Sequence, residues 1–148
     1  MLEVGRPEDY EEQIANSLSR LTSADVLIHL GDVCLGNDAE AHKKYIEPLK
    51  CRKILVKGNH DQKSLSWYME HGWGFACNRM TLDFGGETLH FSHIPLPPDD
   101  FFGRNIHGHL HNVEHRSYPK WYSERHSLVS LERQGYKAQR LDTFIQSR

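Results

Sequence analysis

The segment Gly-Asn-His-Asp at residues 58–61 follows the apolar run Ile-Leu-Val at residues 54–56. An apolar run that leads into Lys-Gly is typical of a buried strand that ends in a tight turn. The turn brings an amide oxygen, an imidazole and a carboxylate together at the end of that strand. This stretch therefore predicts a strand at residues 53–56 that presents metal-binding or catalytic side chains at its end.

Three further apolar segments end in Asp or His in a similar way. Residues 26–30 lead into Gly31 and Asp32, residues 89–92 lead into His93, and residues 105–107 lead into Gly-His-Leu-His at residues 108–111. Side chains that follow neighbouring strands gather at one edge of a sheet, where ligands of α/β proteins commonly bind. The four segments together predict a metal site at the carboxyl ends of the strands.

The apolar pattern predicts an α/β fold. The strand at residues 26–30, a helix at residues 37–48 and the strand at residues 53–56 are joined by short turns, which is typical of a parallel unit with helical cover. Residues 26–30 are expected to be a central strand because they are apolar on both faces.

The second half of the chain predicts antiparallel pairing, so the sheets are expected to be mixed. Gly85-Gly86 lies between residues 80–84 and 87–92 and is a signal for a two-residue hairpin. The other expected elements are helices at residues 7–21 and 64–71, a strand at residues 127–131 and a turn of helix at residues 141–145.

Composition favours a single domain, residues 1–148, in the cytoplasm. The formal net charge is −2, so no basic field for nucleic acid is present at this level. The three cysteines are interpreted as reduced thiols. No apolar run approaches the roughly 20 residues of a membrane span, and no signal-peptide pattern opens the sequence.

The side chains at the strand ends are of the types that bind hard or borderline divalent metals, which take imidazole nitrogen and carboxylate or amide oxygen. The predicted metal ligands are Asp32, Asn59, His93, His109 and His111. His60 follows one of these ligands and is predicted to act as a general acid, oriented by Asp61.

Simpler interpretations exist for other polar and aromatic residues. His29 and His90 lie inside strands and are expected to be packed or hydrogen-bonded, whereas His107 is open between packing and lining the site. The histidines interpreted as solvated are His42, His71, His115 and His126. The residues that either contact substrate or merely pack in later loops are Arg104, Trp121, Tyr122 and Arg125.

In their order along the chain, these motifs resemble the calcineurin-like metallophosphoesterases, in particular the small single-domain bacterial and phage members. The resemblance implies a β-sandwich of mixed sheets flanked by helices, with a metal site at the strand ends. It implies that Asp32 bridges two ions, that Asn59, His93 and His109 complete one shell, and that His111 belongs to the other. Manganese, iron, zinc and nickel all remain open as the metal.

One departure from the family concerns its first strand, which ends in Asp-x-His and supplies two metal ligands. No Asp-x-His precedes Asp32 in this sequence. We expect a member without that strand, numbered from an internal methionine or naturally truncated. The site then holds one or two metals, and a homodimer is expected as one way to fill the open side of residues 26–30. Glu3, Glu8 or Asp9 either replaces the missing ligands or lies on a solvated helix start.

The resemblance implies a metal-dependent phosphoester hydrolase, either a phosphomonoesterase or a phosphodiesterase, that uses a metal-bound hydroxide. The expected partner is a phosphoester substrate, a small molecule or a nucleotide, and no membrane. The alternative is a catalytically impaired binding or scaffold protein that keeps the fold with a degraded metal site.

Overall fold

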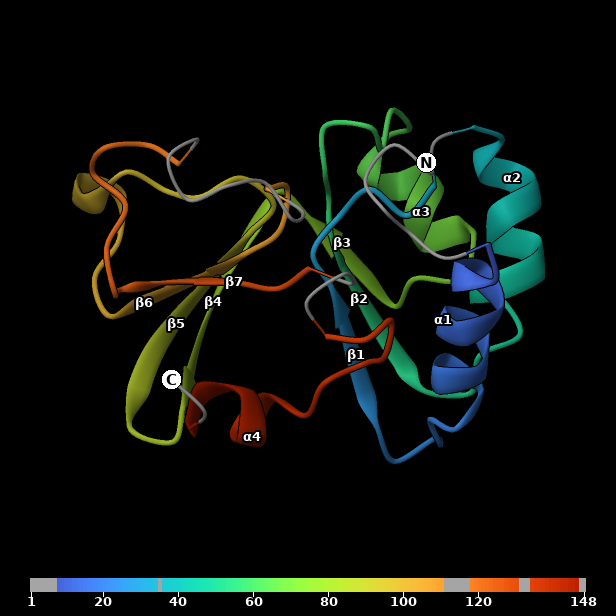
Figure 1. The fold of residues 1–148 in the computed structure, drawn as a ribbon. Coiled ribbons are helices and arrows are strands. Elements are labelled where there is room, and N and C mark those ends of the chain that lie inside the picture. Colours follow the sequence, from blue (N-terminus) through green and yellow to red (C-terminus); the bar gives the residue numbers. More distant parts are fainter. Residues whose placement is uncertain (1–7, 35, 111–117, 131–133, 147–148) are drawn as a thin grey trace.

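The computed structural model describes residues 8–34, 36–110, 118–130 and 134–146, which form two sheets flanked by helices (Figure 1). The helices are α1 (Tyr10–Ser19), α2 (Asp38–Ala41), α3 (Leu65–Glu70) and α4 (Leu141–Gln146), with a π-helical turn η2 (His42–Ile46) and a 3-10 turn η3 (Pro98–Asp100). The strands are β1 (Val26–His29), β2 (Arg52–Val56), β3 (Phe75–Cys77), β4 (Arg79–Phe84), β5 (Glu87–Ser92), β6 (Arg104–His107) and β7 (His126–Leu128).

The first sheet is parallel and has the order β1-β2-β3. Ile28 pairs with Ile54, and Val56 pairs with Cys77. The predicted parallel unit of β1 and β2 is confirmed, and α1, α2 and α3 lie on the outer side of this sheet (Figure 1). Among the described residues β1 pairs with β2 alone and Val26 is 53% exposed, so within this part of the chain β1 is an edge strand, and the expectation of a central strand stays a prediction.

The second sheet is mixed and has the order β4-β5-β6-β7. β4 and β5 are antiparallel, whereas β5, β6 and β7 run parallel to one another. The predicted hairpin is confirmed: Gly85 and Gly86 have φ of 60° and 81°, and a two-residue turn with positive φ at both positions matches the twist of the flanking strands.

Two hydrophobic clusters hold these layers together, and β2 contributes to both of them. Val56 packs between the sheets with Leu89, Phe91 and Ile106 of the second sheet. Leu55 points the other way, to a cluster that includes Tyr68 of α3, Trp73 and Ile46. Successive residues of a strand face opposite sides, so β2 joins the sandwich core to the helical layer.

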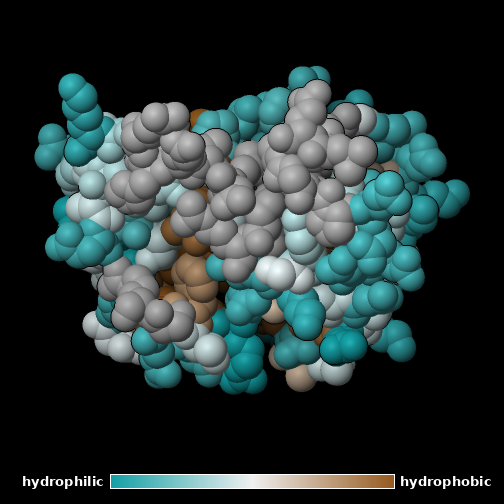
Figure 2. Space-filling view, viewed as in Figure 1, coloured by the Kyte–Doolittle hydropathy of each residue, from teal (hydrophilic) through white to brown (hydrophobic). Residues whose placement is uncertain are grey.

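Hydrophilic side chains cover the helical side of the molecule, and apolar side chains are visible on the side of the second sheet (Figure 2).

Two histidines that the sequence predicts to be solvated are buried. His42 is fully buried and its ring contacts those of Trp67, Tyr68 and Trp73. His126 is 6% exposed and stacks on Tyr122.

The helix expected at residues 37–48 forms as α2 followed by η2, and the expected final strand is shortened to β7. Asn37 caps α2, since its side chain accepts a hydrogen bond from the Glu40 amide. Within the described ranges, no helix combines the length and the apolar character needed to cross a membrane.

Candidate metal centre

Side chains from the ends of four strands meet at one point. Asn59 Oδ1 lies 2.8 Å from His93 Nε2, Asp32 Oδ2 lies 3.1 Å from it, and His109 Nδ1 lies 3.2 Å from it. One ligand atom each from Asp32, His93 and His109 lie within 4.8 Å of one another. The four residues predicted to share a metal shell are therefore brought together.

The hydrogen bonding of His93 indicates which of its ring nitrogens can bind a metal. His93 Nδ1 donates to the Leu30 carbonyl oxygen at 2.7 Å, which assigns the proton of a neutral ring to Nδ1. Nε2 then carries a lone pair that faces a carboxylate oxygen of Asp32 and the amide oxygen of Asn59. An imidazole nitrogen, a carboxylate oxygen and an amide oxygen together form a donor set that fits a divalent cation.

Two of these ligands have unusual backbone conformations. Asp32 has φ of 58° and His109 has φ of 70°, which places both in the left-handed region. Such a conformation costs about 1–3 kcal/mol for a residue other than glycine and persists only where the surroundings enforce it. Among the described residues other than glycine, three have positive φ, and two of them, Asp32 and His109, belong to the ligand cluster; the third is Tyr136.

Glycines allow the two loops of the site to approach one another. Gly31 has φ of 101°, and a Cβ there would lie 2.7 Å from His93 Nδ1. A Cβ on Gly58 would overlap Asp32 Oδ1 and lie 2.6 Å from the Asp32 amide nitrogen. Both positions require the absence of a side chain, which explains the glycines that precede Asp32 and Asn59.

Asp61 has a different set of partners from the one predicted. Its Oδ2 accepts hydrogen bonds from the amides of Asp32 at 2.7 Å and Gly58 at 2.8 Å, and its Oδ1 accepts one from Val33 at 3.0 Å. Asp61 is 2% exposed. Its carboxylate thus contacts the backbone behind Asp32, and within the described part of the chain it makes no hydrogen bond to the His60 ring.

His60 lies beside the cluster with an exposed side chain. Its backbone amide donates to Asp32 Oδ1 at 2.8 Å, which leaves Asp32 Oδ2 directed at His93. An exposed imidazole next to a ligand cluster is free to reach a bound substrate, as the predicted general acid requires. His111, the remaining predicted ligand, lies outside the described residues.

His107 is fully buried behind the site. Its Nδ1 donates to the Gly108 carbonyl oxygen at 2.9 Å, and its Nε2 accepts from the Tyr122 hydroxyl at 2.7 Å. Burial lowers the pKa of His107 to about 4, so the ring is neutral at physiological pH. The sequence alone left the role of His107 open. His107 is the last residue of β6, a strand in which every residue is buried, and this burial indicates a structural contact.

The loop residues considered for substrate contact have packing partners. The guanidinium of Arg125 donates to the carbonyl oxygens of Phe101 and Gly103 and lies over the Phe101 ring. Arg104 is buried and forms an ion pair of 3.0 Å with Glu87. For both arginines these contacts favour packing within the protein over contact with a substrate.

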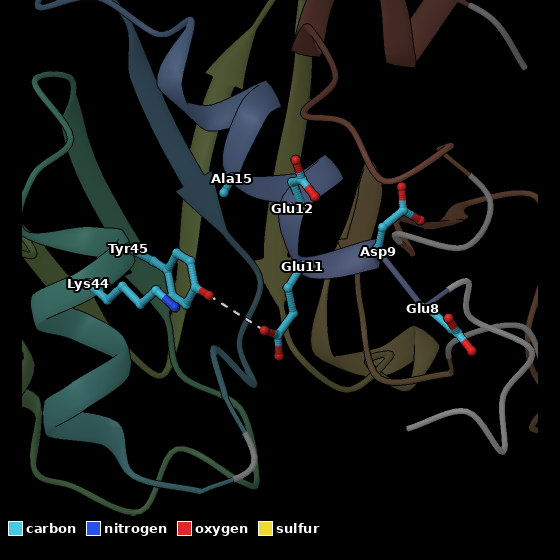
Figure 3. Close-up of a pocket in the computed structure, with 7 residues that line it drawn as sticks. All are labelled: Glu8, Asp9, Glu11, Glu12, Ala15, Lys44 and Tyr45. Atoms are coloured by element: carbon cyan, nitrogen blue, oxygen red, sulfur yellow. Dashed lines mark hydrogen bonds between the residues drawn. The ribbon is translucent and has the colours of Figure 1, made fainter.

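The acidic start of α1 forms a separate pocket (Figure 3). Its lining residues are Glu8, Asp9, Glu11, Glu12, Ala15, Lys44 and Tyr45. The Tyr45 hydroxyl contacts Glu11 Oε2 at 3.5 Å, and Asp9 accepts from the Gln13 side chain. Glu8 and Asp9 are exposed, which fits a solvated helix start.

Comparisons with known proteins concern the fold and the family of this chain. A protein of unknown function from Aquifex aeolicus has a similar solved structure, with a TM-score of 0.66 at 23% identity over 89% of this chain and 81% of that chain. At this identity the similarity concerns the fold alone. No curated protein matches the sequence. The family model of the calcineurin-like phosphoesterases matches residues 4–143 of the 148 residues. The chain therefore belongs to the calcineurin-like phosphoesterase family.

Proposed function

We propose that this protein hydrolyses phosphoesters with the help of a divalent transition metal ion held by Asp32, Asn59, His93 and His109. The observation that supports this most strongly is the convergence of their ligand atoms within 2.8–3.2 Å of His93 Nε2. Imidazole nitrogens with carboxylate and amide oxygens form a mixed set that suits manganese, iron, zinc or nickel.

A metal bound there would supply charge stabilisation for a phosphoryl group and lower the pKa of the attacking water. The protein residues set the geometry around it. Leu30 fixes the His93 ring through Nδ1, and the His60 amide fixes Asp32 through Oδ1, so that one atom of each side chain is aimed at the cluster. His60 is proposed to donate a proton to the departing oxygen from its exposed side chain.

The proposed substrate is a phosphoester of a small molecule or of a nucleotide, cleaved as a monoester or as a diester. His111 is retained as the proposed ligand of a second ion, as the family resemblance implies. A second ion, if held there, would supply further charge stabilisation for the phosphoryl group.

Hydrolysis by purified protein tests this proposal. The protein is stripped with a chelator, reloaded separately with Mn²⁺, Fe²⁺, Zn²⁺ and Ni²⁺, and assayed with p-nitrophenyl phosphate and bis(p-nitrophenyl) phosphate. We expect metal-dependent release of p-nitrophenol from at least one ester, and loss of that activity in His93→Ala. Metal binding with no hydrolysis of either ester would instead support the alternative of a binding or scaffold protein.

A further inference from the structure

We propose that Asp61 and His107 are positioning residues that hold Asp32 and His109 in their left-handed, metal-binding conformations. The inference rests on the proposed metal centre and assigns a task to two buried polar side chains that are not ligands. Each of them hydrogen-bonds to backbone in the turn that carries a strained ligand. Neither is assigned a contact with the metal or the substrate.

Asp61 holds the turn after β1. Its two carboxylate oxygens accept the amides of Asp32, Val33 and Gly58 at 2.7–3.0 Å. Two successive amides at and after Asp32 therefore point to the same buried carboxylate, which keeps the peptide units on either side of Asp32 in place. The Gly58 bond ties this turn to the loop that carries Asn59.

His107 has the corresponding place in the turn after β6. The Leu110 amide donates to the Gly108 carbonyl oxygen at 2.8 Å, which closes a three-residue turn with His109 at its centre. A turn of this kind with positive φ is rare and strained. The same Gly108 oxygen accepts His107 Nδ1–H, and the other side of the His107 ring is fixed by Tyr122.

The two arrangements share a physical logic. A left-handed Asp or His reverts to a commoner conformation unless the surroundings enforce it, and either reversal would swing the ligand atom away from His93. Outer-shell residues that orient ligands typically contribute 10–100-fold in metal affinity. We therefore expect Asp61 and His107 to act on metal affinity through the backbone of Asp32 and His109.

The test measures the Mn²⁺ dissociation constant of full-length variants by isothermal titration calorimetry. Asp61→Asn keeps the side-chain volume but replaces one acceptor oxygen by a donor, and His107→Phe removes the donor to Gly108. We expect each to weaken Mn²⁺ binding by about 10–100-fold. Asp25→Asn is the matched control, because Asp25 also accepts a backbone amide (Thr22, 2.7 Å) but lies in an exposed turn away from the cluster. Its dissociation constant should equal that of the wild type.

Conservative rescue separates positioning from a general loss of stability. In His107→Asn the side-chain amide can replace Nδ1–H as the donor to Gly108, so metal affinity should return toward that of the wild type while the buried volume is still reduced. If a variant is unfolded without metal, the dependence of its melting temperature on Mn²⁺ concentration gives the same constant. Unchanged affinity in Asp61→Asn or His107→Phe, or equal losses in His107→Asn and His107→Phe, would overturn the inference.

These readouts do not depend on turnover. Weakened binding in the variants of a wild type that binds Mn²⁺ but hydrolyses neither ester would support the positioning roles and refute the proposed function. If the wild type hydrolyses an ester and the variants bind Mn²⁺ as tightly as the wild type, the proposed function is supported and the positioning roles are refuted. A wild type that binds no divalent metal would overturn both.

Discussion

His93 and Asp32 face each other across the two sheets of the molecule, with Nε2 and Oδ2 3.1 Å apart. Asp32 follows β1 of the first sheet, and His93 follows β5 of the second. Because their side chains are only 5% and 9% exposed, the contact is made in a partly dehydrated place where an uncompensated charge is costly. The site thus depends on how the sandwich packs as well as on local motifs.

Replacing the histidine at the centre of the cluster should strongly weaken metal binding. His93→Ala removes the nitrogen on which the other ligand atoms converge, so Mn²⁺ affinity should fall by more than roughly 100-fold, the upper end of what an outer-shell residue costs. Titration calorimetry measures this. His71→Ala is the control, because His71 stacks on Trp67 outside the cluster. Wild-type affinity in His93→Ala would exclude the proposed site.

Removing the His60 side chain should slow hydrolysis and leave metal binding intact. His60 contacts the cluster through its backbone amide, so His60→Ala should keep the wild-type Mn²⁺ dissociation constant. The rate should fall by roughly 10²–10⁴ if the ring transfers a proton. Steady-state kinetics with the better of the two p-nitrophenyl esters checks this, and unchanged turnover would remove His60 from the mechanism.

A methyl group at Gly31 should damage the site. Gly31→Ala is strained at φ 101° and brings a Cβ to 2.5 Å from the Gly58 amide nitrogen, so the turns that carry Asp32 and Asn59 must separate. We expect both a lower melting temperature and weaker Mn²⁺ binding. Gly36→Ala is the matched control, since a Cβ there meets nothing within 4 Å. Equal behaviour of the two variants in thermal unfolding and titration would contradict this account.

The stability of the metal-free protein should fall in mild acid because His107 is buried in its neutral form. Its pKa in the folded state is about 4, below the ordinary 6.5. Between these values the unfolded chain binds a proton that the folded chain does not, so the free energy of unfolding decreases as pH falls. The full effect of a shift from 6.5 to about 4 is on the order of 3 kcal/mol.

Urea unfolding of wild type and His107→Phe, at neutral pH and at about pH 5, measures this contribution. The variant should show a smaller loss of stability on acidification. His29 and His90 also have a pKa lowered by burial, so the variant keeps part of the slope. Identical slopes in the two proteins would show that His107 does not contribute.

The metal-binding side chains could be predicted from the sequence because only a few residue types bind divalent metal ions. Asp32, Asn59, His93 and His109 each follow an apolar run that forms a strand, and parallel strands carry such residues to a common edge. The hairpin was equally accessible, since Gly85-Gly86 supplies the positive φ that its turn requires. Short-range signals were sufficient for the hairpin and for placing each ligand at a strand end, whereas the meeting of the two sheets at the site follows from how the sandwich packs.

Long-range contacts explain the errors. The backbone amides that donate to Asp61 belong to Asp32 and Val33, about thirty residues earlier in the chain. The sequence showed only the adjacent His60, so Asp61 was predicted to orient that residue. β3 has three residues and no clear alternation, and it forms by pairing with β2. His42 was predicted to be solvated because its side chain is polar, but in the folded chain its ring packs against those of Trp67 and Trp73.

The most direct test of the metal centre is a crystal structure of protein grown with Mn²⁺, with anomalous scattering recorded to locate the ion. We predict a peak within about 2.0–2.6 Å of Asp32 Oδ2, Asn59 Oδ1, His93 Nε2 and His109 Nδ1. A manganese peak elsewhere, or none near these four atoms at saturating Mn²⁺, would contradict the proposal that they form a metal-binding site.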